Sequence, residues 1–234
     1  MNQSTAHPHT HVIGRLSHFW TTDRSLSVFL GLLLVAVFIV APLAEQQDML
    51  YASVGFSVLL LSGVGLVAKN RMTRGLVTGM ALVTLVIHWI QHIVPGAGLA
   101  SMSALSSMGF LGLLAGLVFL EVLKKGPITL HRVQGAIAVY LLFGLIWAFA
   151  YDLVILHAPN AFHADELTVQ HGALTPTLLY FSFATLTTVG YGDITPIHPI
   201  ARSLAMLEAF VGQLFPTILI ARLVAMELQY RQPR

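Results

Sequence analysis

The sequence predicts an all-α membrane protein with six transmembrane helices and one shorter helix that enters the membrane and turns back. Of its 234 residues, 56% are hydrophobic and only 9% are charged, and the mean hydropathy is +0.79. A soluble domain carries about 25% charged residues, so this chain has too few to cover a water-facing surface. Six long apolar runs, and basic residues confined to alternate connections, are the other two observations behind the prediction.

Six apolar segments are long enough to cross a bilayer, because a spanning helix needs about 20 mostly apolar residues. They are residues 25–44, 50–68, 75–94, 102–120, 133–151 and 203–221. Glu208, in the sixth segment, is the only charged residue inside any of them. Residues 1–24 are polar and lack the pattern of a cleaved signal peptide, so we expect a cytoplasmic tail there.

The positions of Lys and Arg predict the orientation, because these residues collect on the cytoplasmic side of a membrane protein. With the N-terminus inside, only Arg202 of the 12 basic residues lies outside. The others are Arg15, Arg24, Lys69, Arg71, Arg74, Lys124, Lys125, Arg132, Arg222, Arg231 and Arg234. We therefore expect a multi-pass protein of the plasma membrane, the inner membrane of a prokaryote, with both termini in the cytoplasm.

The connection between the fifth and sixth segments contains an apolar stretch, LTPTLLYFSFATLTT, that is too short to span. Thr175 is a suitable N-cap and Pro176 a suitable first helical residue, which predicts a helix over 175–187. Such a helix, about 18 Å long, enters the membrane and must be followed by backbone that climbs back out. Non-helical backbone is tolerated at that depth only where it is buried in protein or lines a watery cavity.

The returning backbone, TVGYGD, alternates Gly190 and Gly192 with Val189 and Tyr191. Carbonyl groups of an extended chain can all face one axis only if alternate residues take left-handed torsions, which glycine adopts freely. Rings of such carbonyls, with the Thr188 hydroxyl at the inner end, replace the hydration shell of a cation. The negative C-terminal end of the preceding helix would favour a cation in the middle of the membrane.

The stretch TTVGYGD, residues 187–193, resembles the signature of potassium channels residue for residue. The resemblance extends over residues 132–226, about forty per cent of the chain. It implies that K⁺ is coordinated by the filter, that Gly192 shapes the outer mouth, and that Thr187 and Asp193 support it. The ion-coordinating positions would be Thr188, Val189, Gly190 and Tyr191.

Two positions before the filter bear on this resemblance. Family members often place an aromatic residue where this chain has Tyr180, which implies a hydrogen bond from Tyr180 to Asp193. Some bacterial relatives carry a glutamate where this chain has Ala184, so the carboxylate pair of those relatives is absent here.

One filter segment per chain supplies one carbonyl to each ring, and a pore axis needs about four, so we expect a homotetramer. The pore domain would cover 133–226, with pore helix 175–187, filter 188–192 and inner helix 201–226. Residues 25–123 would form a four-helix membrane domain, 124–132 a cytoplasmic linker and 227–234 a short tail. Segment 102–120 contains no Lys or Arg, so the front domain lacks the charges of a voltage sensor.

The inner helix raises two further expectations. Gly212 and Pro216 either form a hinge that opens and closes the pore, or Gly212 only permits close helix packing. Glu208 either braces the pore helix through hydrogen bonds or takes part in ion passage. We expect Arg202 to pair with an acidic neighbour such as Asp152.

The histidines indicate three further groups of candidate residues. His7, His9 and His11 alternate in the tail, which indicates either a weak transition-metal site or a disordered tail without function. His88 and His92 lie one helical turn apart, which indicates either a Zn²⁺ site or neutral histidines that hydrogen-bond to neighbours. His157, His163 and His171 fall in the outer loop, where external acid would protonate them.

The sequence therefore predicts a potassium-selective channel that conducts K⁺ passively, is not voltage-sensing and is not an enzyme. We expect no organic cofactor and no nucleic-acid partner, and contact with membrane lipids. The alternative is a non-conducting or regulatory membrane protein that retains the pore fold. We expect no regulatory domain after the sixth span, so gating would come from the filter, the inner helix, lipids, pH or a separate regulatory subunit.

Overall fold

The computed structural model describes residues 25–46, 50–66, 71–124, 129–163 and 176–231, and these are mostly helical. The predicted tail 1–24, much of the predicted linker, the proposed N-cap Thr175 and His171 lie outside these residues.

The first helix is continuous from residue 25 but widens in the middle. Residues 25–35 are α-helical, η1 (Ala36–Val40) is a π-helical turn, and α2 (Ala41–Gln46) resumes the α-helix. The Ala41 N–H donates to the carbonyl of Ala36, five residues back. Pro42 follows and has no N–H for the next helical bond, so the widened turn lies where the regular ladder is already interrupted.

The remaining helices are α3 (Leu50–Leu66), α4 (Arg71–Ile93), α5 (Ala97–Val122), α6 (Leu130–His157), α7 (Pro176–Leu186) and α8 (Pro199–Arg231). Two short strands, β1 (Phe162–His163) and β2 (Thr195–Pro196), lie between them. Among the described residues five helices are long and apolar enough to cross a membrane: Ser25–Leu43, α4, α5, α6 and Pro199–Leu228 of α8. The predicted second span corresponds to α3, whose 17 residues are at the lower limit for spanning.

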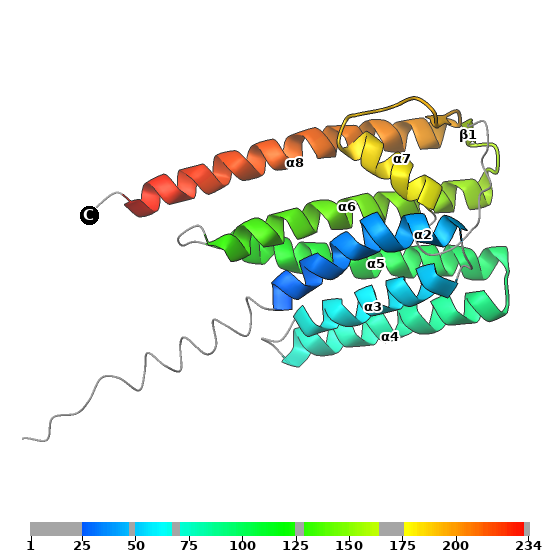
Figure 1. Ribbon diagram of the computed structural model, residues 1–234, viewed down its shortest axis with the longest axis horizontal. Helices are drawn as coiled ribbons and strands as arrows, with labels where there is room; N and C mark the ends of the chain where they lie inside the picture. The colour runs from blue at the N-terminus through cyan, green and yellow to red at the C-terminus, as the bar shows by residue number, and fades with distance from the viewer. Residues whose placement is uncertain (1–24, 47–49, 67–70, 125–128, 164–175, 232–234) are drawn as a thin grey trace, which may run out of the picture.

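The long helices run up and down between two ends of the molecule (Figure 1). The start of α4, the end of α5, the start of α6 and the end of α8 all lie at the same end. Arg71, Lys124, Arg132 and Arg231 belong to these helix ends. Arg202 is in the first turn of α8, at the opposite end. The fold thus gathers at one end these four of the basic residues that are predicted to be cytoplasmic.

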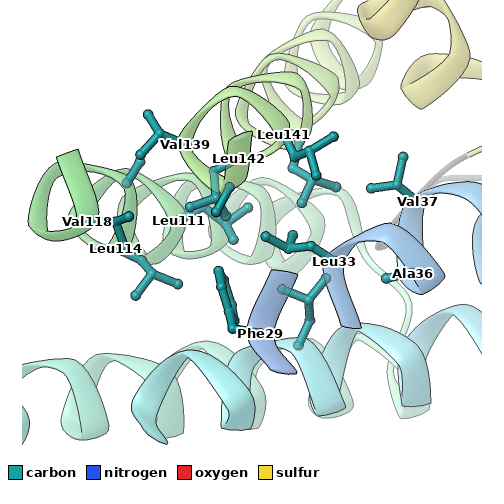
Figure 2. Packing of buried hydrophobic residues seen from close by; sticks show 14 of the residues in the cluster. Phe29, Leu33, Ala36, Val37, Leu111, Leu114, Val118, Val139, Leu141 and Leu142 are labelled. Atoms are coloured by element: carbon teal, nitrogen blue, oxygen red, sulfur yellow. The ribbon is translucent and has the colours of Figure 1, made fainter. Parts of the chain in front are cut away.

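The main hydrophobic core forms between the first helix, α5 and α6 (Figure 2). Phe29 and Leu33 come from the first helix, Leu111 and Leu114 from α5, and Leu142 from α6, and all five are buried. This cluster draws on both the predicted front domain and the predicted pore domain, so the two share a core. In the spanning window of α6, 61% of the residues are buried, against 17% for α8, whose surface is mostly uncovered within one chain.

Phe215, near the middle of α8, packs against three aromatic rings of α5 and α6. Its ring lies 5.1 Å from that of Phe143 and 6.0 Å from that of Tyr140, both on α6, and 5.9 Å from that of Phe119 on α5, between centroids.

A smaller cluster closes the end of the molecule where α7 and α8 begin. Three rings, Tyr151, Phe162 and Phe181, meet edge to face with centroids 5.0–5.6 Å apart. Strands β1 and β2 pair antiparallel, and the N–H groups of Ile197 and His198 donate to the Ala161 carbonyl at 2.8 and 3.1 Å. The loop after α6 is therefore fastened to the segment that precedes α8.

Candidate functional site

Helix α7 carries the glycine-containing loop and begins at Pro176, as the sequence predicts. Its 11 residues span about 16 Å, too short to cross a bilayer. The Thr187 N–H and hydroxyl both donate to the Phe183 carbonyl, at 3.0 and 2.6 Å, so α7 ends in a hydrogen-bonded turn. The chain then returns to the end of the molecule from which α8 starts (Figure 1).

The loop backbone alternates left-handed with ordinary torsions. The φ angles of Thr188, Gly190 and Gly192 are +61°, +56° and +82°, and Val189 and Tyr191 alternate with them. The sequence predicts this for the two glycines, which adopt positive φ freely. Thr188 was not predicted, because a β-branched residue in this region is an outlier that costs about 1–3 kcal/mol.

The loop is anchored to the last turn of α7 through its N–H groups. Val189 and Gly190 both donate to the Ala184 carbonyl, at 2.9 and 3.1 Å, and Thr188 donates to Thr185 at 2.9 Å. In a trans peptide the carbonyl points opposite to the N–H of the same unit. The Thr188 and Val189 carbonyls therefore point away from α7, and both point to the same side.

The outer part of the loop is supported by two side-chain contacts. The Tyr180 hydroxyl donates to Asp193 Oδ2 at 2.8 Å, so the hydrogen bond that the sequence predicts is present. Asp193 Oδ1 accepts from the Ile194 N–H at 3.0 Å, and the rings of Tyr180 and Tyr191 stack at 6.0 Å. The bond to Asp193 raises the pKa of the Tyr180 phenol, so the neutral donor form persists into alkaline solution.

Two glycines let the long helices approach α7 closely. A Cβ on Gly144 of α6 would lie 2.5 Å from the Phe183 ring. A Cβ on Gly212 of α8 would lie 1.9 Å from the Leu186 carbonyl oxygen, which also accepts a hydrogen bond from Tyr140 at 3.0 Å. This short distance is what the close-packing role predicted for Gly212 requires. Helix α8 is continuous through it and through Pro216, and the hinge stays a prediction.

Glu208 is fully buried behind α7. Its Oε1 lies 2.6 Å from Ser182 Oγ on α7, and its Oε2 accepts from the Tyr151 hydroxyl on α6 at 2.5 Å. Ser182 Oγ is also 2.8 Å from the Gly144 carbonyl. The hydrogen bond to Ser182 of α7 is the kind expected of a bracing residue.

Arg202 donates from Nε to the Pro196 carbonyl at 3.1 Å, and its pairing with Asp152 stays a prediction. Sequence reasoning missed Tyr151, Ser182 and Gly144. Each is an unremarkable residue of an apolar helix, and only the fold brings them to Glu208.

The histidines do not form a larger cluster in the part of the chain that the structure describes. There, no group of three or more His, Cys, Asp or Glu residues could hold a metal ion. His88 is buried against the ring of Phe56, and His92 lies beside Trp89.

Residues 135–228 match the family model described as "Ion channel". Two curated relatives are similar over part of that region. Protein LctB of Bacillus caldotenax is 38% identical over 71 residues, which are 30% of this chain and 48% of the relative. Protein LctB of Geobacillus stearothermophilus is 46% identical over 46 residues, 20% of this chain and 34% of the relative. The chain thus spans half or less of the relatives it matches, and no solved structure matches it.

Proposed function

This chain belongs to the potassium channel superfamily, and from that premise we propose that it is a homotetrameric, potassium-selective channel that conducts K⁺ passively. The observation that carries the proposal is the alternation of positive φ at Thr188, Gly190 and Gly192 in a loop that returns from a short helix. This torsion pattern is what consecutive carbonyls need in order to face one axis.

The anchoring of the loop supports the same proposal. Because the N–H groups of Val189 and Gly190 are taken up by α7, the carbonyls of Thr188 and Val189 point to the opposite side. We propose that Thr188, Val189, Gly190 and Tyr191 coordinate K⁺ there, and that Gly192 shapes the outer mouth. Thr187, Asp193 and Tyr180 would hold the loop in register with α7, which would be a re-entrant pore helix.

The uncovered surface supports assembly of four copies around the loop. Within one chain Val189 and Tyr191 are 53% and 70% exposed, and α8 exposes a long apolar face. Four loops around one axis would complete each carbonyl ring, and the α8 helices would line the pore below it.

The front helices fit a supporting role without voltage sensing. Helix α5, which contains the fourth predicted span, has no Lys or Arg. Lys124 follows two residues after the end of the helix. A charge there crosses none of the membrane field. We propose that the protein lies in the plasma membrane with both termini in the cytoplasm, in contact with lipids, and that K⁺ is the transported ion.

The proposal is tested by the reversal potential of the purified protein in planar bilayers with unequal K⁺ and Na⁺. We expect reversal near the K⁺ equilibrium potential, and loss of that selective current in Gly190→Ala. An alanine at φ +56° is strained by about 1–2 kcal/mol, so we expect the backbone to rotate and a carbonyl to turn away from the axis. A matched control is Gly79→Ala on α4, where a Cβ meets nothing within 4 Å.

A tetramer that passes no current over a wide range of voltage, pH and lipid would contradict conduction by this chain alone. It would favour the alternative of a non-conducting or regulatory protein. Thermal stabilisation by K⁺ but not by Na⁺ would then separate a closed channel, whose filter still binds ions, from that alternative.

A further inference from the structure

Ser182, beside Glu208, makes two short oxygen–oxygen contacts but carries only one proton to share between them. Ser182 Oγ lies 2.8 Å from the Gly144 carbonyl and 2.6 Å from Glu208 Oε1. Both distances are those of O–H···O hydrogen bonds, and each such bond needs one proton between its oxygens. A serine hydroxyl carries a single proton, and a peptide carbonyl carries none.

If the two contacts are separate hydrogen bonds rather than one shared O–H, the second proton belongs to Glu208. With Glu208 protonated on Oε1, the carboxylic acid donates to Ser182, and Ser182 donates to the Gly144 carbonyl. The Tyr151 hydroxyl donates to Oε2, which is then the carbonyl oxygen of the acid. Every polar atom in this arrangement has a partner, as buried groups require.

The surroundings agree with a neutral acid. Glu208 is 0% exposed, and an ionised carboxylate without a cation beside it is costly at such a site. Tyr151 and Tyr140 of α6 are titratable groups that interact with it, and neither is a cation. On its own helix the nearest basic residue is Arg202, six positions away, whose Nε is taken up by Pro196. The group of α7 that contacts Glu208 is Ser182, which is uncharged.

We propose that Glu208 is a neutral carboxylic acid that acts as a positioning residue, donating its proton to Ser182 and so joining α8 to α7 and α6 behind the filter. The proposal rests on the proposed function for its consequence, because α7 carries the filter. It gives Glu208 a role distinct from ion passage: the acid proton holds α7 at a fixed height against α8. Movement of α8 would then reach the filter through one relay of hydrogen bonds.

Infrared spectroscopy tests the protonation without any measurement of current. The difference spectrum between wild type and Glu208→Gln at neutral pH cancels every other carboxyl group. We expect the carbonyl absorption of one protonated acid, shifted on exchange into D₂O. Carboxylate absorptions in its place would overturn the proposal.

Conservative and apolar variants test the positioning. Gln can donate from its amide to Ser182 and accept from Tyr151, so Glu208→Gln should retain most of the selectivity for K⁺. Glu208→Leu has a similar volume but no donor, and Ser182→Ala removes the relay. We expect each to lower the selective K⁺ flux on the order of tenfold or more. The matched control is Ser62→Ala, because the Ser62 hydroxyl donates to the Leu59 carbonyl within its own helix.

Two results on these variants would overturn the positioning role: a Glu208→Gln tetramer as impaired as Glu208→Leu, or a Glu208→Leu tetramer as selective as wild type. If Glu208→Leu does not assemble, Ser182→Ala and Glu208→Gln still decide the question. If wild type itself passes no current, the proposed function fails. The infrared result, and the thermal stability of Glu208→Gln against that of Ser182→Ala, then test the neutral acid and its relay separately.

Discussion

At the scale of the residue, the contact of Gly212 with the end of α7 is the closest that any described glycine makes with another element. Its hypothetical Cβ lies 1.9 Å from a backbone oxygen, which cannot move aside as a flexible side chain can. The same oxygen is fixed from the other side by the Tyr140 hydroxyl. The position is therefore closed to any side chain, whether or not α8 also bends there.

Gly212→Ala should destabilise the folded protein by about 3 kcal/mol, the upper end of the usual cost of overpacking. We also expect loss of K⁺ selectivity, because the end of α7 must shift and the loop is hydrogen-bonded to it. Thermal unfolding in detergent and the reversal potential measure the two effects.

The control for this variant is Gly79→Ala on α4, which should be neutral or stabilising because alanine favours a helix over glycine. A stable Gly212→Ala tetramer with normal selectivity would show that Gly212 does not lie against the Leu186 carbonyl in the assembled protein.

Residues also mark how far the sequence could predict the site. Positive φ at Gly190 and Gly192 follows from chemistry, because glycine is the residue that takes these torsions without strain. Thr188 could not be predicted, because its local preference opposes the torsion that the hydrogen bonds to α7 impose. Tyr151 lies 57 residues from Glu208, and nothing in an apolar helix indicates which face will meet a carboxyl group.

At the scale of the element, α7 is held between α6 and α8. Ser182 and Phe183 both contact α6 at Gly144, the first through a hydrogen bond and the second through its ring. Because Gly144 has no side chain, the Phe183 ring can lie against the backbone of α6. These contacts fix the position of α7 along α6.

Gly144→Ala should cost about 1–3 kcal/mol, because the Phe183 ring must move away from the new methyl group. Phe183→Leu should relieve part of that cost in the double variant, since leucine is smaller and more adaptable than the ring. A double-mutant cycle on thermal unfolding gives the coupling.

Costs that simply add would show that the two side chains do not meet. In that case the crossing of α6 and α7 lies elsewhere along the two helices.

The lengths of the elements show what hydropathy can and cannot predict. The sixth span was predicted over 203–221, whereas α8 runs from Pro199 to Arg231. Hydropathy detects the part of a helix that suits lipid, and the helical hydrogen bonds continue past Arg222 into more polar sequence. The second predicted span shows the reverse limit, because α3 has an apolar sequence but only 17 residues in the described structure.

At the scale of the whole molecule, the up-and-down arrangement places connections at two opposite ends. The end that gathers basic residues is predicted to face the cytoplasm. The connection between α4 and α5, around Gly96, lies at the other end.

The orientation can be measured by cysteine labelling, because the chain contains no native cysteine. In intact cells a membrane-impermeant thiol reagent should label Gly96→Cys and should not label Lys124→Cys. After the membrane is permeabilised both should react. The opposite pattern in intact cells would invert the predicted topology and with it the direction in which the loop faces.

In the proposed channel, the contact of Phe215 with α5 and α6 would make α8 a lever, with Leu219 packed in the same core one helical turn further on. The outer arm is held at Glu208 and Gly212, while the inner arm extends 16 residues from Phe215 to Arg231, about 24 Å. With Phe215 as the fulcrum, a tilt of about 10° would carry the inner tip about 4 Å sideways over that length. In the proposed tetramer, four such tips around one axis would widen or narrow the opening at this end several-fold more than the proposed filter. A small rotation at the fulcrum would then be amplified at the mouth.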